Sequence, residues 1–285
     1  MHKLLTGALS TEKLTVKIPN LPLSLAGLKL VQMSDFHYDN GLLSEKMLTE
    51  AIAVSNAAKP DLVILTGDYV NTIAKPIHQL ASRLKNLESR YGVYAILGNH
   101  DICYPSSKLE ITNALTNVGI NVLWNQIAYP LGEKLPLVGL ADFYSREFNP
   151  EAIMNQLDST TPRIVLSHHP DTAEILKKWR VDLQLSGHSH GGQIVIPGMG
   201  PAMIYYAKIV KKIPKKLLRK LPFLRKTHSI LRHWQWSEGL HIVGNNQLYV
   251  NRGLGTYFPG RLFCPPEVTI ITLEIPVLPY LLCQI

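Results

Sequence analysis

The pattern of apolar and polar residues at the start of the chain alternates short extended runs with a helical stretch. Strict alternation over residues 14–18 predicts a half-buried strand, and the apolar runs at residues 28–33 and 61–65 predict buried strands. Residues 44–59 have apolar side chains at steps of three and four, the spacing of one buried helix face, and Ser44 can cap this helix. The pattern therefore predicts a strand, a helix and a second strand in succession.

The same alternation continues through the middle of the chain. Further helices are predicted at residues 78–89, 106–118 and 150–157, and over a segment capped by Asp171 that ends at Trp179. Further strands are predicted at residues 93–97, 135–140, 163–166 and 181–185. Strands that alternate with helices indicate the α/β class.

Near the C-terminus the pattern changes to strands alone. Residues 241–243 and 248–250 flank the turn Gly244-Asn245-Asn246, which is typical of a hairpin, and residues 268–275 form a last strand. The alternating first and last strands suggest antiparallel pairing in addition to the parallel strands, so we expect mixed sheets. Residues 1–285 contain no linker that would divide them, which predicts a single domain with one insertion.

Charge and composition change this picture in one place. The net charge is +8, but residues 183–237 contain ten Lys or Arg and no Asp or Glu. A basic amphipathic insertion is therefore predicted at about residues 201–238. The three cysteines form no CxxC pair and no signal peptide is evident, so we expect a cytoplasmic protein without disulfides.

Five predicted strand ends carry side chains that can bind metals. In open α/β sheets, ligand sites gather beyond the carboxyl ends of the strands. Carboxylate, imidazole and amide oxygen form a ligand set that suits Mn, Fe or Zn, with room for two ions bridged by one carboxylate. Taken singly, each residue could instead cap a helix, form a turn or lie in the core. The candidate ligands are Asp35, His37, Asp68, Asn99, His168, His188 and His190, and His100 lies beside them.

The short segments that contain the candidate ligands, and their order along the chain, resemble the signature of the calcineurin-like metallophosphoesterase superfamily. The tail segments at residues 248–256 and 261–267 resemble one bacterial branch, the YkuE and YaeI type phosphodiesterases, which includes a UDP-2,3-diacylglucosamine hydrolase of lipid A biosynthesis. The matching blocks are Asp35-Phe36-His37, Gly67-Asp68, Gly98-Asn99-His100-Asp101, Ser167-His168 and Gly187-His188-Ser189-His190.

The resemblance implies a fold, a metal centre and a reaction. The fold is a β-sandwich of mixed sheets flanked by helices, and the cofactors are two divalent metal ions, with Mn favoured. His100 is expected to donate a proton to the substrate, Asp101 is expected to orient its ring, and direct hydrolysis by water is the expected route. One metal is assigned to Asp35, His37, Asp68 and His190, and the other to Asp68, Asn99, His168 and His188, with His168 preferred to His169.

The basic insertion has three interpretations. Apolar residues at steps of three and four, including Val210 and Ile213, and the nearby Trp234 and Trp236 predict a membrane-surface segment of two short helices, the second beginning near Pro214. A solvated basic helix packed on the domain and a nucleic-acid site are the alternatives. The predicted membrane-binding residues are Lys208, Lys211, Lys212, Lys215, Lys216, Arg219 and Lys220.

These observations favour hydrolysis of a phosphodiester or pyrophosphate bond on an amphiphilic, lipid-linked substrate such as UDP-2,3-diacylglucosamine. We expect the enzyme to be peripheral on the inner face of the membrane, with an anionic surface as its partner. One alternative is a phosphodiesterase or nuclease acting on nucleic acid or small soluble diesters. The other is a non-catalytic, membrane-docking metal-binding module.

Overall fold

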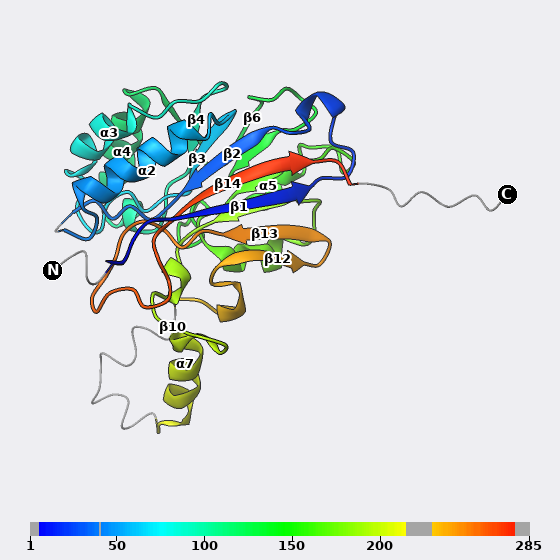
Figure 1. The fold of residues 1–285 in the computed structure, drawn as a ribbon. Coiled ribbons are helices and arrows are strands. Elements are labelled where there is room, and N and C mark those ends of the chain that lie inside the picture. Colours follow the sequence, from blue (N-terminus) through cyan, green and yellow to red (C-terminus); the bar gives the residue numbers. More distant parts are fainter. Residues whose placement is uncertain (1–5, 40, 215–229, 277–285) are drawn as a thin grey trace.

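Two six-stranded β-sheets form the centre of the molecule (Figure 1). The computed structural model describes residues 6–39, 41–214 and 230–276. In spatial order, the first sheet, here called the β2 sheet, contains β1 (Ser10–Lys17), β14 (Glu267–Glu274), β2 (Lys29–Met33), β3 (Leu62–Leu65), β4 (Val93–Ala95) and β5 (Ile120–Val122). The second, the β9 sheet, contains β12 (Gly239–Val243), β13 (Asn246–Val250), β9 (Leu183–Ser186), β8 (Ile164–Leu166), β7 (Leu137–Gly139) and β6 (Gln126–Ala128).

Both sheets are mixed, as the sequence predicted. In the β2 sheet the last strand, β14, runs antiparallel to β2, whereas β1 runs parallel to β14. Strands β2 to β5 are parallel to one another. In the β9 sheet the predicted hairpin of β12 and β13 is present, and β6 also pairs antiparallel with β7.

Apolar residues of β3 show how the sequence builds the layers. Leu62 and Ile64 point into the core between the two sheets, while Val63 and Leu65 point into the core under the helices of the β2 sheet. Successive side chains of a strand alternate between its faces, and here both faces are covered. A continuous apolar run is therefore the pattern that this strand requires.

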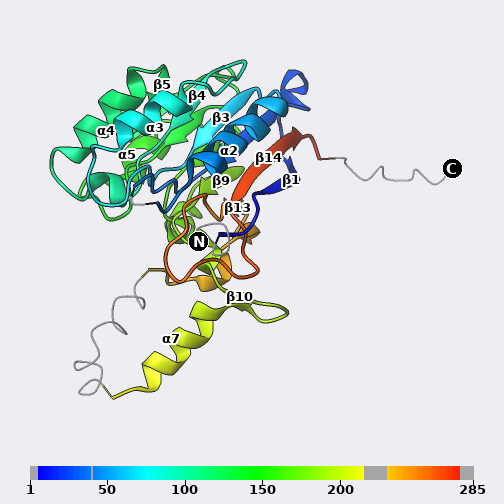
Figure 2. The ribbon, with the colours of Figure 1, turned by 60° about the vertical axis from the view of Figure 1, so that its left-hand side comes forward.

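Helices cover the outer face of each sheet (Figure 2). Helices α2 (Glu45–Ala57), α3 (Ile77–Leu84) and α4 (Ser107–Thr116) pack on the β2 sheet. Helices α5 (Pro150–Met154) and α6 (Ala173–Leu176) pack on the β9 sheet. The Ser44 hydroxyl accepts from Met47 N at 3.2 Å and caps α2, as expected.

One local prediction was wrong, and two short strands were missed. Asp171 does not cap a helix: the side chain of His169 accepts from Asp171 N, and the Asp171 carboxylate accepts the main-chain N–H groups of Arg232 and His233. This long-range pairing has no signature in local spacing. The short strands β5 and β6 were not predicted, because three residues are too few to show a period.

The insertion begins with β10 (Val195–Ile196), β11 (Gly200–Pro201) and helix α7 (Ala202–Lys212). Helix α7 extends away from the two sheets (Figures 1 and 2). The predicted second helix lies outside the described residues. Val210 and Trp234 are buried, so the expectation that they face a membrane is wrong. Over the described parts of the chain, no helix has the length and apolar character needed to cross a bilayer.

Candidate metal centre

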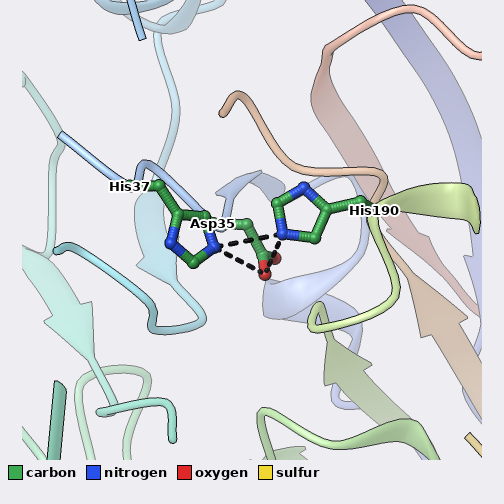
Figure 3. A group of neighbouring side chains, drawn as sticks. All are labelled: Asp35, His37 and His190. Carbon is green, nitrogen blue, oxygen red and sulfur yellow. Dashed lines mark hydrogen bonds and ion pairs between the residues drawn. The ribbon is translucent and has the colours of Figure 1, made fainter. Parts of the chain in front are cut away.

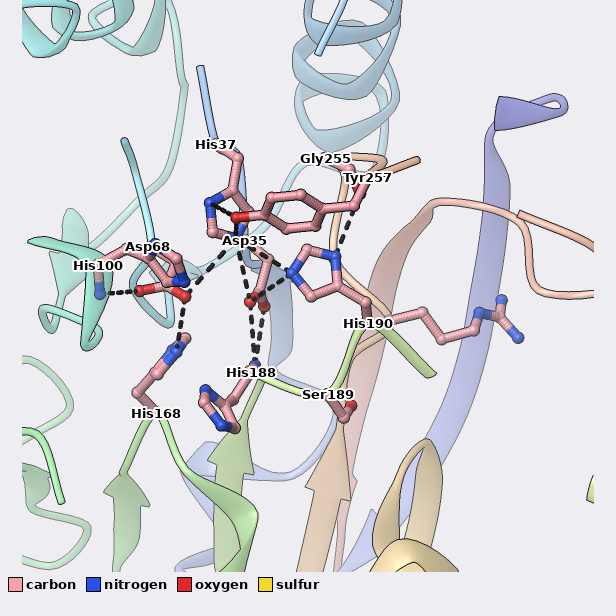
Figure 4. Close-up of polar contacts among 12 residues, drawn as sticks. Asp35, His37, Asp68, His100, His168, His188, Ser189, His190, Gly255 and Tyr257 are labelled. Carbon is pink, nitrogen blue, oxygen red and sulfur yellow. Dashed lines mark hydrogen bonds and ion pairs between the residues drawn. The ribbon is translucent and has the colours of Figure 1, made fainter. Parts of the chain in front are cut away.

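The candidate metal ligands lie in loops at the carboxyl ends of strands from both sheets. Asp35 and His37 follow β2, Asp68 follows β3, and Asn99 follows β4. On the other sheet, His168 follows β8, and His188 and His190 follow β9. The two sheets are stacked with these ends at one edge, so segments that lie far apart in the sequence converge on one site (Figure 4).

The backbone at this edge adopts a conformation that non-glycine residues rarely take. The φ angles of five candidate ligands lie between 43° and 69°. Such angles cost energy and persist where the surrounding structure enforces them, typically at functional sites. These residues are Asp35, His37, Asp68, His188 and His190.

Two glycines make room for the candidate carboxylates. A Cβ atom on Gly98 would lie 2.2 Å from Asp68 Oδ1, and one on Gly187 would lie 2.3 Å from Asp35 Oδ2. Both distances are far inside van der Waals contact, and both atoms belong to candidate ligand carboxylates. Any larger residue at these two positions would push a carboxylate out of the site.

The first group of donor atoms comes from Asp35, His37 and His190 (Figure 3). Asp35 Oδ1 lies 3.4 Å from His190 Nε2 and 3.8 Å from His37 Nε2. The two Nε2 atoms of His37 and His190 are 3.1 Å apart. These three buried side chains thus direct one oxygen and two nitrogens toward the same point.

The second group comes from Asp68, His168 and His188, whose donor atoms lie within 4.8 Å of one another. Asp68 Oδ2 lies 3.1 Å from His168 Nε2 and also 3.6 Å from His37 Nε2 of the first group. Asp68 therefore stands between the groups (Figure 4), where a carboxylate that bridges two ions would lie.

Unsatisfied buried atoms support a metal at the second group. Asn99 Oδ1 and His188 Nδ1 are buried and have no hydrogen-bond partner within the described part of the chain. An unpaired buried polar atom is costly, and a cation at the second group would satisfy His188 Nδ1, which belongs to that group. The donor set of carboxylates, imidazoles and an amide oxygen fits divalent Mn, Fe or Zn.

In three candidate imidazoles, a main-chain carbonyl oxygen lies within hydrogen-bond distance of one ring nitrogen. A carbonyl oxygen only accepts, so the ring nitrogen facing it carries the hydrogen and the other nitrogen is free to bind a metal. The pairs are His168 Nδ1 and Thr66 O at 2.6 Å, His190 Nδ1 and Gly255 O at 3.2 Å, and His188 Nε2 and Ile230 O at 3.2 Å. On this pattern His168 and His190 offer Nε2, and His188 offers Nδ1.

The charges of two carboxylates and two imidazoles at the site also suit metal binding. Burial would raise the pKa of Asp35, but His190 lowers it below the usual range. Burial likewise opposes ionisation of Asp68, but His168 lowers its pKa well below the usual value. Burial lowers the pKa of His190 to about 3 and that of His188 well below its usual value. Ionised carboxylates and neutral imidazoles are the forms that bind cations.

His100 lies at the same centre, with one ring nitrogen within 4.8 Å of donor atoms of His37 and Asp68. The expectation that Asp101 orients this ring needs correction. His100 Nδ1 instead lies 2.5 Å from the carbonyl oxygen of Asn71. The buried Asp101 carboxylate accepts main-chain N–H groups of the loops after β3 and β4, those of Asp68, Tyr69, Val70 and Gly98.

His169, the neighbour of His168, points elsewhere. Its Nε2 lies 3.1 Å from the hydroxyl oxygen of Tyr144 and 3.1 Å from the carbonyl oxygen of Ile230. Among the described residues it belongs to none of the groups of donor atoms, whereas His168 does.

Tyr257 is a site residue that the sequence analysis missed. Its hydroxyl lies 2.8 Å from His37 Nδ1 (Figure 4). The same hydroxyl donates to Asn71 Oδ1 at 2.6 Å. The only signal was its position directly after residues 248–256, one of the two tail segments that resemble the bacterial branch. The backbone path that returns this tail to β2 could not be inferred from spacing.

Comparison with known proteins identifies the class. The family model for calcineurin-like phosphoesterases matches residues 28–192, more than half of the chain. The chain therefore belongs to the calcineurin-like phosphoesterase family, and it is a metal-dependent phosphoesterase, a hydrolase. The match covers all seven candidate ligands and both groups of donor atoms.

Three relatives resemble the chain over most of its length. It is 30% identical to the uncharacterized metallophosphoesterase YkuE of Bacillus subtilis, over 93% of this chain and 86% of that protein. It is 30% identical to phosphodiesterase YaeI of Escherichia coli, over 87% and 83%. It is 28% identical to UDP-2,3-diacylglucosamine pyrophosphatase LpxG of Chlamydia muridarum, over 92% and 88%.

Proposed function

We propose that this protein hydrolyses a phosphodiester or pyrophosphate bond of an amphiphilic, lipid-linked substrate, using two divalent metal ions. The observation that carries the dinuclear proposal is the position of Asp68 between two groups of donor atoms. The best single candidate substrate is UDP-2,3-diacylglucosamine, because the chain resembles LpxG over most of both sequences.

The metal ions would be held by seven side chains. We assign Asp35, His37, Asp68 and His190 to one ion, and Asp68, Asn99, His168 and His188 to the other, and we favour Mn. Two such ions, when bound, supply positive charge to the phosphoryl oxygens and make a water molecule acidic enough to act as a nucleophile.

The protein's own contribution is to place the substrate and move a proton. We assign His100 to the substrate, where it donates to a phosphoryl oxygen or protonates the leaving oxygen. The Asn71 carbonyl oxygen holds His100 Nδ1, which leaves Nε2 for this task. Water then attacks phosphorus opposite the leaving oxygen, and the P–O bond to the leaving group breaks as that oxygen gains its proton.

The basic insertion supports a membrane-borne substrate. Lys208 and Lys212 on α7 are exposed. Lysines near an anionic bilayer attract it, and a patch of them would hold the enzyme on the inner face of a membrane. Four other basic residues of the proposed patch, Lys215, Lys216, Arg219 and Lys220, lie outside the described residues, and the side chain of Lys211 is not described.

Two alternatives were open from the sequence. A phosphodiesterase or nuclease that acts on soluble diesters or nucleic acid retains support, because the chain is 30% identical to phosphodiesterase YaeI and 28% identical to LpxG, and because the insertion is basic. A non-catalytic metal-binding module is set aside, because the chain belongs to a family of hydrolases and has two groups of metal donors.

A substrate screen tests the proposal. The purified protein is supplied with Mn, Fe or Zn and given UDP-2,3-diacylglucosamine, bis(p-nitrophenyl) phosphate or single-stranded DNA, each with and without detergent. We expect the diacylated substrate to have the highest kcat/KM, with a marked dependence on detergent. Preference for DNA or for the soluble diester would replace the lipid-linked substrate by the alternative.

A further inference from the structure

Large apolar side chains are exposed on two neighbouring loops at the end of the molecule that carries α7. Phe258 is 90% exposed, Phe263 is 67% exposed and Leu262 is 54% exposed, all in the loop between β13 and β14. Ile196 and Met199 are exposed on the β10–β11 hairpin. We call these five residues the apolar rim. Single exposed apolar residues are ordinary, but a group of them marks an interaction surface.

Hydrogen bonds join the two loops into one surface. Val195 N donates to Leu262 O at 2.9 Å, and Leu262 N donates to Gln193 O at 2.8 Å. The Gln193 side chain in turn accepts from Tyr257 N at 2.7 Å. The hairpin and the loop lie side by side below β13 in Figure 2.

The apolar rim adjoins the metal centre. Tyr257, directly before Phe258, has its hydroxyl 2.8 Å from His37 Nδ1, and the carbonyl oxygen of Gly255 lies 3.2 Å from His190 Nδ1. The same loop therefore contacts two candidate metal ligands and presents phenylalanine to solvent. A substrate whose phosphoryl group reaches the metals would extend its apolar part along this loop.

Exposed positive charge continues the surface onto α7. Tyr205 donates to the carbonyl oxygen of Met199 at 2.9 Å, and Lys208 Nζ lies 5.6 Å from the centre of the Tyr205 ring. Lys208 and Lys212 are exposed. Val210 is 3% exposed and therefore cannot supply the membrane anchor, whereas Ile209 on the same helix is 62% exposed.

We infer that the apolar rim inserts into the interfacial region of an anionic lipid bilayer and sets the metal centre against the membrane surface. Aromatic and aliphatic side chains at loop tips, flanked by lysines, match the apolar and anionic layers of such a surface. Single-stranded nucleic acid would use the lysines and could stack bases on the phenylalanines, but it would leave the aliphatic side chains of Leu262, Ile196 and Met199 unburied. The inference rests on the proposed membrane-borne substrate and adds the side chains that contact lipid.

Binding to vesicles tests this inference without any turnover. Wild-type protein and the double variant Phe258→Ser with Phe263→Ser are sedimented with vesicles of phosphatidylcholine mixed with phosphatidylglycerol, at low and at high salt. Removal of two side chains from the interface should lower the partition coefficient at least about tenfold at both salt concentrations, because salt does not screen the apolar contribution.

The matched control is the double variant Leu23→Ser with Ile242→Ser. These side chains are 82% and 67% exposed, but they lie near the carboxyl end of β14 and the amino end of β13, the edge opposite the metal centre. We expect the control to bind vesicles like wild type. Thermal unfolding midpoints close to wild type would show that all variants fold.

Three outcomes would overturn the inference. The wild-type protein could fail to bind the vesicles, the Phe258→Ser and Phe263→Ser variant could bind as strongly as wild type, or the control variant could lose as much binding as that variant. Wild-type binding to single-stranded DNA in place of vesicles counts among the first. Failure of the proposed substrate is a separate result, because binding is measured without hydrolysis. A protein that binds through the apolar rim but does not cleave UDP-2,3-diacylglucosamine would keep this inference and lose that substrate.

Discussion

At the residue scale, the candidate metal centre depends on the neighbouring groups that fix the orientation of its side chains. Main-chain oxygens face one ring nitrogen of His168, His188 and His190, and glycine at positions 98 and 187 admits the carboxylates. Each donor atom is thereby directed inward before any ion binds. Such preorganisation reduces the cost of ordering ligands around an ion.

Asp68→Asn tests the bridging carboxylate. One neutral amide cannot balance the charge of two divalent ions, so we expect loss of hydrolysis and a fall in bound metal. Activity on bis(p-nitrophenyl) phosphate and metal content by mass spectrometry provide the measurements. Full activity with two ions still bound would rule out the assignment of Asp68 as the bridge.

A pair of variants separates His168 from His169. His168→Ala removes a donor that faces Asp68 and should lose both metal and activity, whereas His169→Ala removes a ring that faces Tyr144. We expect the second variant to retain most of both properties in the same assays. The reverse result would mean that the ligand of this loop is His169.

His100→Asn tests a role on the substrate rather than on the metal. We expect metal content near wild type and a fall in kcat of about 10²–10⁴, the usual range for a lost acid or base. The fall should be smaller for a diester with a good leaving group, since such a leaving group needs no proton. A variant that loses metal in proportion to activity would make His100 a ligand.

At the element scale, the returning end of the insertion is attached directly to the metal centre. The carboxylate of Asp171 accepts the N–H groups of Arg232 and His233 at 2.7 Å and 3.0 Å, and the carbonyl oxygen of Ile230 faces His188. The returning end of the insertion therefore orients a candidate ligand, His188. Its position links the surface that carries α7 to the site.

Asp171→Ala should destabilise the protein, because it leaves two part-buried N–H groups, those of Arg232 and His233, without their charged acceptor. We expect the free energy of unfolding to fall by about 2 kcal/mol or more, measured in urea. Asp158→Ala is the control, since this exposed carboxylate accepts hydrogen bonds only from Thr160 within the described part of the chain. Equal free energies of unfolding for the two variants would mean that the hydrogen bonds from Arg232 and His233 to Asp171 do not stabilise the protein.

At the scale of the whole molecule, the charge is concentrated where membrane contact is proposed. Ten basic residues and no acidic ones lie between residues 183 and 237, and the rest of the chain is nearly balanced. Within the described residues, helix α7 and the apolar rim lie at one end of the molecule (Figure 2). This arrangement separates a long-range electrostatic attraction from a short-range apolar contact.

Charge reversal of Lys211, Lys212, Lys215 and Lys216 to Glu tests the electrostatic part. Each lysine near an anionic bilayer contributes about 1 kcal/mol, and salt screens the contribution. We expect wild-type binding to anionic vesicles to weaken with salt without vanishing, and the variant to be released. The same variant should still hydrolyse a soluble diester. Vesicle binding that does not change with salt concentration would show that these lysines do not contribute to the interface.

The sequence by itself determined the fold class and the position of each candidate ligand along the chain. Continuous apolar runs such as that of β3 require cover on both faces, and polar residues directly after such runs must lie at strand ends. The order of the short segments that contain these ligands also indicated the family. These features are local, because they depend on the period and spacing of neighbouring residues.

Only the tertiary structure decided which groups meet at the site. Two contacts join residues far apart in the chain: Tyr257 lies against His37, and the Asn71 carbonyl faces His100 in place of Asp101. Spacing along the sequence does not encode such contacts. They arise when two sheets stack with their strand ends at one edge, which brings the loops of both sheets together.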